Sequence, residues 1–349
     1  MMGISDTARI SYGKIDHFLL IGGGFLLGEF AVHLKKKGYQ VNVFVAKRHV
    51  DEVISDEGFS FKELLEKNKI EYHSPRDINE DEVFIEAGNR GGMGIGFGET
   101  WSFTKRTTEL FNGRLLDVMG IRLPQYRGGA HYTWQILRKN KVGACNLQLI
   151  NEEMIQGEYD SGKIVKSAEY LFSSKARIPK DYFKEAIGNE FEFLKEFVEE
   201  LESGRSFNLF PVPESFSIFF PRLHTKSQAY IDWSWKTDEI ETFICAFDDP
   251  YPGSSTFLNN KRVFLKGCQV EYNDGPFHPF QVGLIYRIDS NGVYIGTKNG
   301  TLIVQVVLGE NGENLIRDLK VGDRFYTPRK NIEDALQFRA DYDSNGLKC

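Results

Sequence analysis

The chain has few cysteines and none at ligand spacing. Its four cysteines, Cys145, Cys245, Cys268 and Cys349, lie far apart among 349 residues. Disulfide-stapled secreted domains and structural zinc sites need cysteines that recur at short intervals. The seven histidines are scattered as well, so the sequence predicts neither a disulfide framework nor a metal site. We expect a reducing, cytoplasmic environment.

Long apolar runs are also missing. No stretch approaches the roughly 18 consecutive apolar residues of a membrane span. The first residues, MMGISDTARISYGKID, contain no apolar core of the kind that a signal peptide needs. We therefore expect neither membrane insertion nor secretion.

Positive charge is not in excess. The 43 Lys and Arg residues are outnumbered by 49 Asp and Glu residues, which gives a formal net charge of −6. Nucleic-acid binding depends on a basic surface, so we expect no nucleic-acid partner. The 41% hydrophobic and 13% aromatic residues can bury a sizeable core, which excludes disorder. The length suits two domains or one large one.

The first structured part has the pattern of a βαβ unit. An apolar run over 18–21 enters three glycines at 22–24, and apolar residues then recur at helical spacing as far as Gly38. A second strand is predicted over 40–45. Such a unit implies a parallel sheet covered by helices.

The three glycines invite comparison with a dinucleotide-binding fingerprint. That motif, counted from Gly22, needs a glycine where the chain has Leu27. The second strand is followed by Ala46, Lys47 and Arg48, where the fingerprint has an acid for a ribose. We interpret the glycines as a tight strand-to-helix turn.

A second α/β stretch leads into a glycine-rich segment. The pattern predicts a helix over 60–67 and a strand over 70–72. Six glycines then fall between Gly88 and Gly98, which predicts a mobile loop followed by a strand ending at Phe97. The strand's backbone packs closely either on a ligand or on a neighbouring helix.

The second half changes character. A long amphipathic helix is predicted over 181–201 and a short helix over 237–247. Asn-Gly pairs at 291–292 and 299–300 are hairpin signals between β-rich runs, which favours a small antiparallel barrel. We therefore predict a mostly parallel α/β domain over 15–205, a linker over 206–221, a barrel over 222–330 and a polar tail over 331–349.

Two ordered blocks of motifs resemble the folate-dependent formyltransferase family over roughly residues 18–310. The first block is Leu123-Pro-x-Tyr-Arg-Gly128, Trp134, Gly143 and Asp160-Ser-Gly162-x-Ile164; the second is Ile231-Asp-Trp-Ser-Trp235, Ile240, Ala246-Phe-Asp248 and Pro250-Tyr-Pro-Gly253. The resemblance implies a Rossmann-like domain that binds N10-formyltetrahydrofolate and passes its formyl group to a primary amine. The resemblance also implies that an OB-like barrel domain follows it.

The usual active centre of that family is altered in this chain. The family has Asn, His and Ser in an Asn-x-His-x-Ser-x-Leu-Pro segment, where this chain has Asp117, Met119 and Ile121. The Asp of the family's Asp-x-Gly motif is retained as Asp160. Met119 has no proton to give, and losing an acid-base group costs roughly 10²–10⁴ in rate.

Asp117 and His131 each have two interpretations. If Asp117 lies near Asp160, one of the two carboxyl groups takes a proton and donates a hydrogen bond to a carbonyl oxygen. Otherwise Asp117 faces water or caps a turn. His131 is either a relocated acid-base group or a surface residue at a helix start.

Binding residues follow from the resemblance in the same way. Phe97 and Trp101, with Gly98 and Gly162, are candidates to line a pterin pocket. Arg127, Tyr126 and Trp233 are candidates to hold the acceptor. Packing is the alternative for the aromatic rings, and a solvated surface is the alternative for the arginine.

The sequence thus carries two functional hypotheses. In the first, the protein formylates the amino group of a nucleotide-linked amino sugar, and the second domain contributes to acceptor binding or to a homodimer contact. The altered centre leaves another one-carbon or acyl donor open. In the second hypothesis, the protein is a catalytically silent relative that binds a folate or a sugar nucleotide without turnover.

Overall fold

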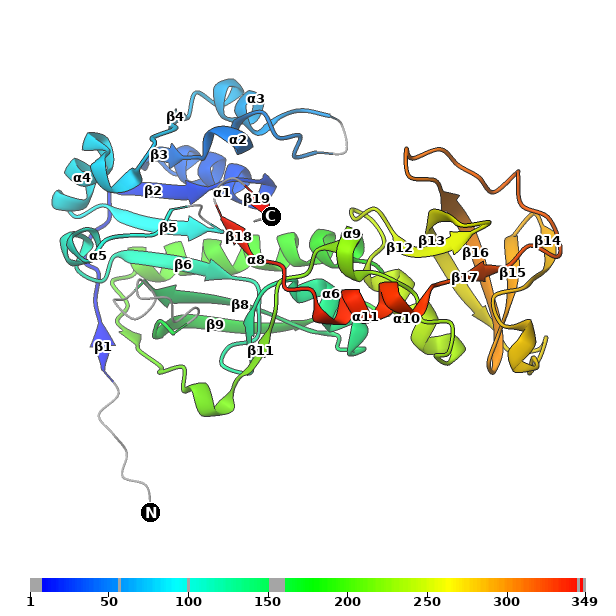
Figure 1. Ribbon diagram of the computed structural model, residues 1–349. Helices are drawn as coiled ribbons and strands as arrows, with labels where there is room; N and C mark the ends of the chain where they lie inside the picture. The colour runs from blue at the N-terminus through cyan, green and yellow to red at the C-terminus, as the bar shows by residue number, and fades with distance from the viewer. Residues whose placement is uncertain (1–7, 56–57, 99–100, 151–160, 344–345, 348–349) are drawn as a thin grey trace, which may run out of the picture. The chain divides into compact units, whose positions relative to one another are not determined.

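Residues 8–55, 58–98, 101–150, 161–343 and 346–347 are described by the computed structural model, which divides into two compact units (Figure 1). The first unit comprises residues 1–128, 142–171 and 186–219, and the second comprises residues 129–141, 172–185 and 220–349. The chain therefore enters the second unit before it has completed the first.

The first unit is built on a seven-stranded sheet with the strand order β4-β3-β2-β5-β6-β8-β9. Five strands run parallel, whereas β8 and β9 run antiparallel to their neighbours. The mostly parallel sheet expected from the sequence is confirmed. The strands are β2 (His17–Gly22), β3 (Gln40–Phe44), β4 (Glu71–His73), β5 (Met93–Phe97), β6 (Leu115–Met119), β8 (Val142–Leu149) and β9 (Ile164–Leu171).

Strand β2 is buried on both faces of this sheet. Phe18 and Leu20 belong to one hydrophobic cluster, whereas Leu19 and Ile21 belong to another, and none of the four is exposed. Because successive side chains of a strand point to opposite faces, an uninterrupted apolar run is what a strand between two helical layers requires.

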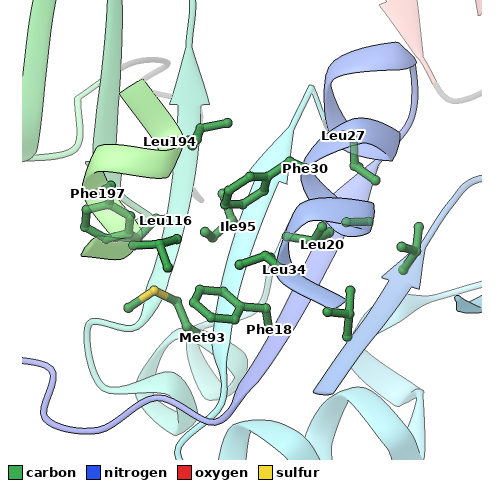
Figure 2. Close-up of a cluster of buried hydrophobic side chains, with 14 of the residues drawn as sticks. Phe18, Leu20, Leu27, Phe30, Leu34, Met93, Ile95, Leu116, Leu194 and Phe197 are labelled. Carbon is green, nitrogen blue, oxygen red and sulfur yellow. The ribbon is translucent and has the colours of Figure 1, made fainter. Parts of the chain in front are cut away.

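Helices α1 (Phe25–Lys36), α3 (Phe61–Lys67) and α8 (Pro179–Glu202) contribute to the first cluster. Figure 2 shows side chains of α1 and α8 directed at those of three strands; the labelled residues are Phe18, Leu20, Leu27, Phe30, Leu34, Met93, Ile95, Leu116, Leu194 and Phe197. On the opposite face, α4 (Glu82–Asn89) and α5 (Lys105–Phe111) contribute Phe84 and Phe111 to the second cluster.

The glycine-rich segment is a packed part of the fold, so the expected mobile loop is wrong for residues 88–92. Helix α4 extends to Asn89 and β5 begins at Met93, which leaves only a short turn between them. A Cβ atom at Gly88 would lie 2.5 Å from Leu110 Cδ2 on α5, and one at Gly94 would lie 2.5 Å from Leu115 Cδ1. The glycines allow close packing, and the predicted strand ending at Phe97 is confirmed.

Short elements complete the first unit. Strands β1 and β10 pair with each other, and β7 pairs with β11. The segment expected to be a linker holds β10, η2 and β11. The short elements are β1 (Arg9–Ile10), α2 (Lys47–Val50), η1 (Ile78–Glu80), β7 (Tyr126–Gly128), β10 (Phe207–Asn208), η2 (Glu214–Phe216) and β11 (Ile218–Phe220).

The second unit contains a six-stranded antiparallel sheet with the order β14-β15-β16-β13-β12-β17. Both predicted hairpins are confirmed, and an isolated bridge between Leu284 and Arg324 links the two edges of the curled sheet. The strands are β12 (Ser254–Leu258), β13 (Lys261–Glu271), β14 (Ile285–Asp289), β15 (Gly292–Thr297), β16 (Gly300–Leu308) and β17 (Phe325–Tyr326).

Helix α6 contacts α10 within the second unit, and Thr133 Oγ1 donates a 3.0 Å hydrogen bond to the Ala246 carbonyl oxygen. The segment expected to be a polar tail overlaps helix α11 and then forms a two-stranded sheet. The remaining elements are α6 (His131–Leu137), α9 (Thr225–Gln228), α10 (Thr237–Ala246), η3 (Pro279–Gln281), α11 (Arg329–Gln337), β18 (Tyr342–Asp343) and β19 (Gly346–Leu347).

Three cysteines that the structure describes, Cys145, Cys245 and Cys268, are free and buried. Within the described ranges there is no helix long and apolar enough to cross a membrane. The same residues contain no cluster of three or more side chains that could hold a metal ion.

Candidate active site

Asp117 places a carboxyl group inside the first unit, near the carboxyl end of β6. Leu115 and Leu116 precede it and are buried in the two hydrophobic clusters, whereas Asp117 itself is 6% exposed. In the sheet, Asp117 lies opposite Gly96 of β5 on one side and Gln148 of β8 on the other. A buried carboxyl group thus interrupts an otherwise apolar strand.

Two wholly buried amides share the sheet face of Asp117. The ladder pairs Asp117 with Gln148 and Met119 with Asn146, and cross-strand partners project from the same face. Asn146 Nδ2 donates to the Ile121 carbonyl oxygen. Among the residues that the structure describes, no group bonds to Asn146 Oδ1 or to either polar atom of Gln148. Each such buried group costs about 1–3 kcal/mol.

Met119 borders an apolar patch beside these polar groups. It packs against a small cluster formed by Ile121, Leu123, Ile164 and Val212. Ile121 is 3% exposed, so the residue at the family's Ser position is part of a core. Met119 thus lies in apolar surroundings, where a flexible thioether side chain fills space between larger residues.

Phe97 is the last residue of β5, the neighbour of β6, and Gly98 follows it directly. The Phe97 ring is half-buried and lies 6.1 Å from the ring of Phe30. Gly98 is exposed and has a φ of +66°, with open space around the position of a Cβ atom. Trp101 is half-buried against the second cluster, and its Nε1 donates a 3.3 Å hydrogen bond to the Arg76 carbonyl oxygen. These contacts do not test whether the three residues bind a pterin, so that role stays a prediction.

Gly162 is buried in the segment that leads into β9. The hydroxyl of the preceding Ser161 is also buried, and no partner for it exists among the described residues. Asp160 lies outside the described residues, and so does the proposed pairing of Asp117 with Asp160.

Tyr126 and Arg127 lie on β7 and are both half-buried. Arg127 Nη2 donates a 2.6 Å hydrogen bond to the Val212 carbonyl oxygen. Its Nε atom is buried, and no group in the described part of the chain accepts from it. Arg127 is therefore anchored at one end of its guanidinium group.

His131 and Trp233 belong to the second unit. His131 is the first residue of α6, which follows the helix-start interpretation of the sequence. Trp233 is 7% exposed, its Nε1 donates a 2.9 Å hydrogen bond to Thr256 Oγ1, and its ring stacks on Phe325. This is the position of a core residue, so we do not include Trp233 in the proposed site.

The polar side chains of Asp117 on β6 and of Asn146 and Gln148 on β8 can donate and accept hydrogen bonds. A carboxamide offers N–H donors and a carbonyl acceptor, and an ionised carboxylate only accepts. Cys145 adjoins Asn146 in sequence but belongs to the other sheet face, with Leu147. Burial raises the pKa of its thiol well above the usual value, which keeps the sulfur protonated. The described residues of this patch therefore offer hydrogen-bond donors and acceptors, and Cys145 offers no thiolate.

Asn146 and Gln148 were not predicted as site residues from the sequence. The signal was present in Gly143-Ala-Cys-Asn-Leu-Gln-Leu149, where two amides alternate with apolar residues. In the neighbouring strand, Asp117 and Met119 have the same spacing of two. Polar residues at this spacing in a strand that is buried on both faces indicate one polar patch.

Comparisons with known proteins agree with this fold. The family described as formyl transferase, C-terminal domain, matches residues 224–316. A methionyl-tRNA formyltransferase of Ruminiclostridium cellulolyticum is 24% identical over 217 residues, which are 62% of this chain and 66% of that protein. The aligned region thus spans just under two thirds of this relative.

Two solved structures share the fold. WlaRD, a sugar 3N-formyl transferase solved in the presence of dTDP and 5-N-formyl-THF, has a TM-score of 0.62 at 16% identity, with 84% of this chain and 98% of that chain covered. The N-formyltransferase of Helicobacter canadensis, in complex with folinic acid and dTDP-3-aminofucose, has a TM-score of 0.61 at 14% identity and covers 84% and 99%.

Proposed function

Because the chain belongs to the folate-dependent formyltransferase family, we propose that it transfers a formyl group from N10-formyltetrahydrofolate to the amino group of a nucleotide-linked amino sugar. The observation that carries the proposal is the pair of buried amides, Asn146 and Gln148, beside Asp117. Their unbonded atoms fit a bound group that contains a carbonyl oxygen and amide-like donors.

The reaction is balanced without any redox step. When bound, the folate supplies the formyl group: the acceptor nitrogen bonds to the formyl carbon, the bond from that carbon to N10 breaks, and N10 gains a proton while the amine loses one. The chain must therefore stabilise negative charge on the formyl oxygen and hold the amine as its proton leaves. By resemblance, Asp160 is the principal base or proton relay. Asp117, as a carboxylate, accepts a hydrogen bond from the acceptor amine.

Two observations support a small acceptor. WlaRD is a sugar 3N-formyl transferase and the Helicobacter canadensis protein is an N-formyltransferase, and both were solved with a dTDP-containing molecule. This chain is acidic overall and its C-terminal domain has no lysine-rich run, whereas a tRNA acceptor needs a surface that neutralises phosphates. The sequence relatives named as methionyl-tRNA formyltransferases make the tRNA the second acceptor to test.

Mass spectrometry tests the proposal directly. The purified chain is incubated with N10-formyltetrahydrofolate and each of a panel of dTDP-, UDP- and GDP-linked amino sugars, and a parallel reaction contains methionyl-tRNA. We expect one sugar nucleotide to gain the mass of a formyl group. No mass gain in any reaction, together with calorimetric binding of 5-formyltetrahydrofolate, favours the catalytically silent relative.

The variant Asp160→Asn tests the proposed proton acceptor. We expect it to abolish transfer while the melting temperature stays close to that of the wild type. Unchanged turnover removes Asp160 from the proposed mechanism.

A further inference from the structure

We propose that Gln148 supplies the carboxamide that hydrogen-bonds the formyl oxygen, on the strand next to the position where the family has its Asn. This inference rests on the proposed function. It assigns a catalytic role to a residue that the family resemblance does not point to, and it explains how transfer proceeds with Asp117 at the Asn position.

The register of the sheet places the amide close to the altered position. Asp117 and Gln148 lie directly opposite each other in the antiparallel pair of β6 and β8. The Cβ atoms of such a pair are roughly 4.5–5.5 Å apart. A glutamine side chain is long enough to reach a group that is bound against its cross-strand neighbour.

The state of the Gln148 side chain does not suit a purely structural role. It is 0% exposed, and neither Nε2 nor Oε1 is hydrogen-bonded within the described part of the protein. Leu147 and Leu149 on either side are apolar, and an apolar side chain of the same length would fill the position of Gln148 without two unbonded polar atoms. A buried polar group left unbonded in this way requires an explanation, and a bound ligand that hydrogen-bonds it supplies one.

Gln148 and Asp117 have different roles in the proposed reaction because one side chain can donate hydrogen bonds and the other can accept them. As the amine attacks, negative charge grows on the formyl oxygen and positive charge grows on the amine nitrogen. A carboxylate has no hydrogen to donate, so Asp117 in its ionised form cannot bond that oxygen as an Asn amide would. Gln148 Nε2 has two N–H donors and can do so, while Asp117 accepts from the amine. Gln148 neither gains nor loses a proton in this step.

The decisive variant is Gln148→Met, which keeps the length of the side chain and removes both polar atoms. Removing one oxyanion donor of this kind typically lowers kcat by roughly 10²–10³-fold. Since the interaction strengthens only as charge develops, we expect the KM for N10-formyltetrahydrofolate to change little. We expect the melting temperature to stay level or rise, because the unbonded polar atoms are gone. Gln148→Glu, which replaces the donor by a carboxylate, should lose at least as much turnover.

Asn42 provides a matched control in the same sheet. It lies on β3, is 2% exposed, and its Oδ1 is bonded to His17 Nε2 at 2.7 Å and its Nδ2 to His73 Nε2 at 3.3 Å. Asn42→Leu therefore removes a buried amide that is already bonded within the protein. We expect it to lower the melting temperature and leave kcat unchanged.

The outcomes separate this inference from the function on which it rests. If the wild type transfers formyl groups and Gln148→Met keeps kcat within threefold, the inference is overturned and the proposed function stands. If Gln148→Met does not fold, or if its melting temperature falls together with its kcat, Gln148 is structural and the inference is again overturned. If the wild type transfers the formyl group to no acceptor although it binds 5-formyltetrahydrofolate, the proposed function is wrong. The inference, which rests on that function, is then wrong as well.

Discussion

Gly22 and Phe97 approach each other so closely that a Cβ atom at Gly22 would lie 2.5 Å from the Phe97 carbonyl oxygen. The two residues are register partners at the ends of the parallel strands β2 and β5. Gly22 also has a φ of +131°, which side chains rarely adopt. The glycine thus allows the ends of β2 and β5 to approach each other closely at Phe97.

The first prediction follows from this contact. Gly22→Ala should lower the free energy of unfolding by roughly 2–5 kcal/mol, through backbone strain and overlap with the carbonyl group. Urea denaturation measures the change. Gly24→Ala is the control, because Gly24 has a φ of +89° but open space around its Cβ position. It should cost only the strain, roughly 1–2 kcal/mol. Equal losses in the two variants would contradict the role given to the contact with Phe97.

Local sequence patterns predicted the scaffold well because each pattern has one physical cause. The apolar run at 18–21 and the helical spacing after Gly24 correctly gave β2 and α1. The Asn-Gly pairs correctly gave both hairpins of the second unit. The glycines at 88–92 led to the wrong prediction of a mobile loop, because close packing and loop flexibility both favour glycine.

The site was harder to predict because it depends on register. Asp117 stood out as a departure from the family's motif, but nothing near it in the sequence identifies its neighbour. Gln148 comes 31 positions later, and only the antiparallel return of β8 beside β6 makes the two residues partners. Trp233 shows the converse: an aromatic residue in a conspicuous motif lies in the core.

The position of Trp233 gives a second prediction. Trp233→Phe removes the hydrogen bond to Thr256 and part of the stack on Phe325, which should cost about 1–3 kcal/mol of unfolding free energy. Because the ring is buried in the second unit, we expect the KM for the amino-sugar acceptor to stay constant. Thermal melting and steady-state kinetics measure the two effects. A several-fold rise in that KM with unchanged stability would instead favour Trp233 as an acceptor contact.

The third prediction concerns acid sensitivity through Glu202 at the end of α8. Hydrogen bonds from Lys37 Nζ at 2.8 Å and from Tyr39 Oη at 2.7 Å hold the pKa of this carboxyl group below its ordinary value of 4.5. The folded state thus prefers the ionised form. Its contribution to stability is present above the unfolded pKa and is lost as the pH falls through the folded pKa.

Glu202→Gln should therefore reduce stability at pH 7 and make the loss of stability below pH 4.5 less steep. The side chain is 41% exposed, so solvent screening limits the effect to about 1 kcal/mol or less. Chemical denaturation at a series of pH values measures it. Lys37→Met is the partner control, and combining it with Glu202→Gln should cost less than the sum of the single losses. Additive losses would show that the ion pair contributes nothing.

The fourth prediction tests whether the amide has been relocated between β6 and β8. If Gln148 does the work of the family's Asn, adding Asp117→Asn to Gln148→Met returns a donor to the neighbouring strand, and kcat should recover at least tenfold relative to Gln148→Met alone. Recovery should be incomplete, because the new amide no longer offers the amine a carboxylate. The two positions are in contact across the ladder, so their effects should be coupled. Single-turnover kinetics of the four proteins measures this coupling. If the fold-decrease in kcat of the double variant equals the product of the fold-decreases of the two single variants, the side chains act independently. The donor at position 148 then does not replace the one missing at position 117.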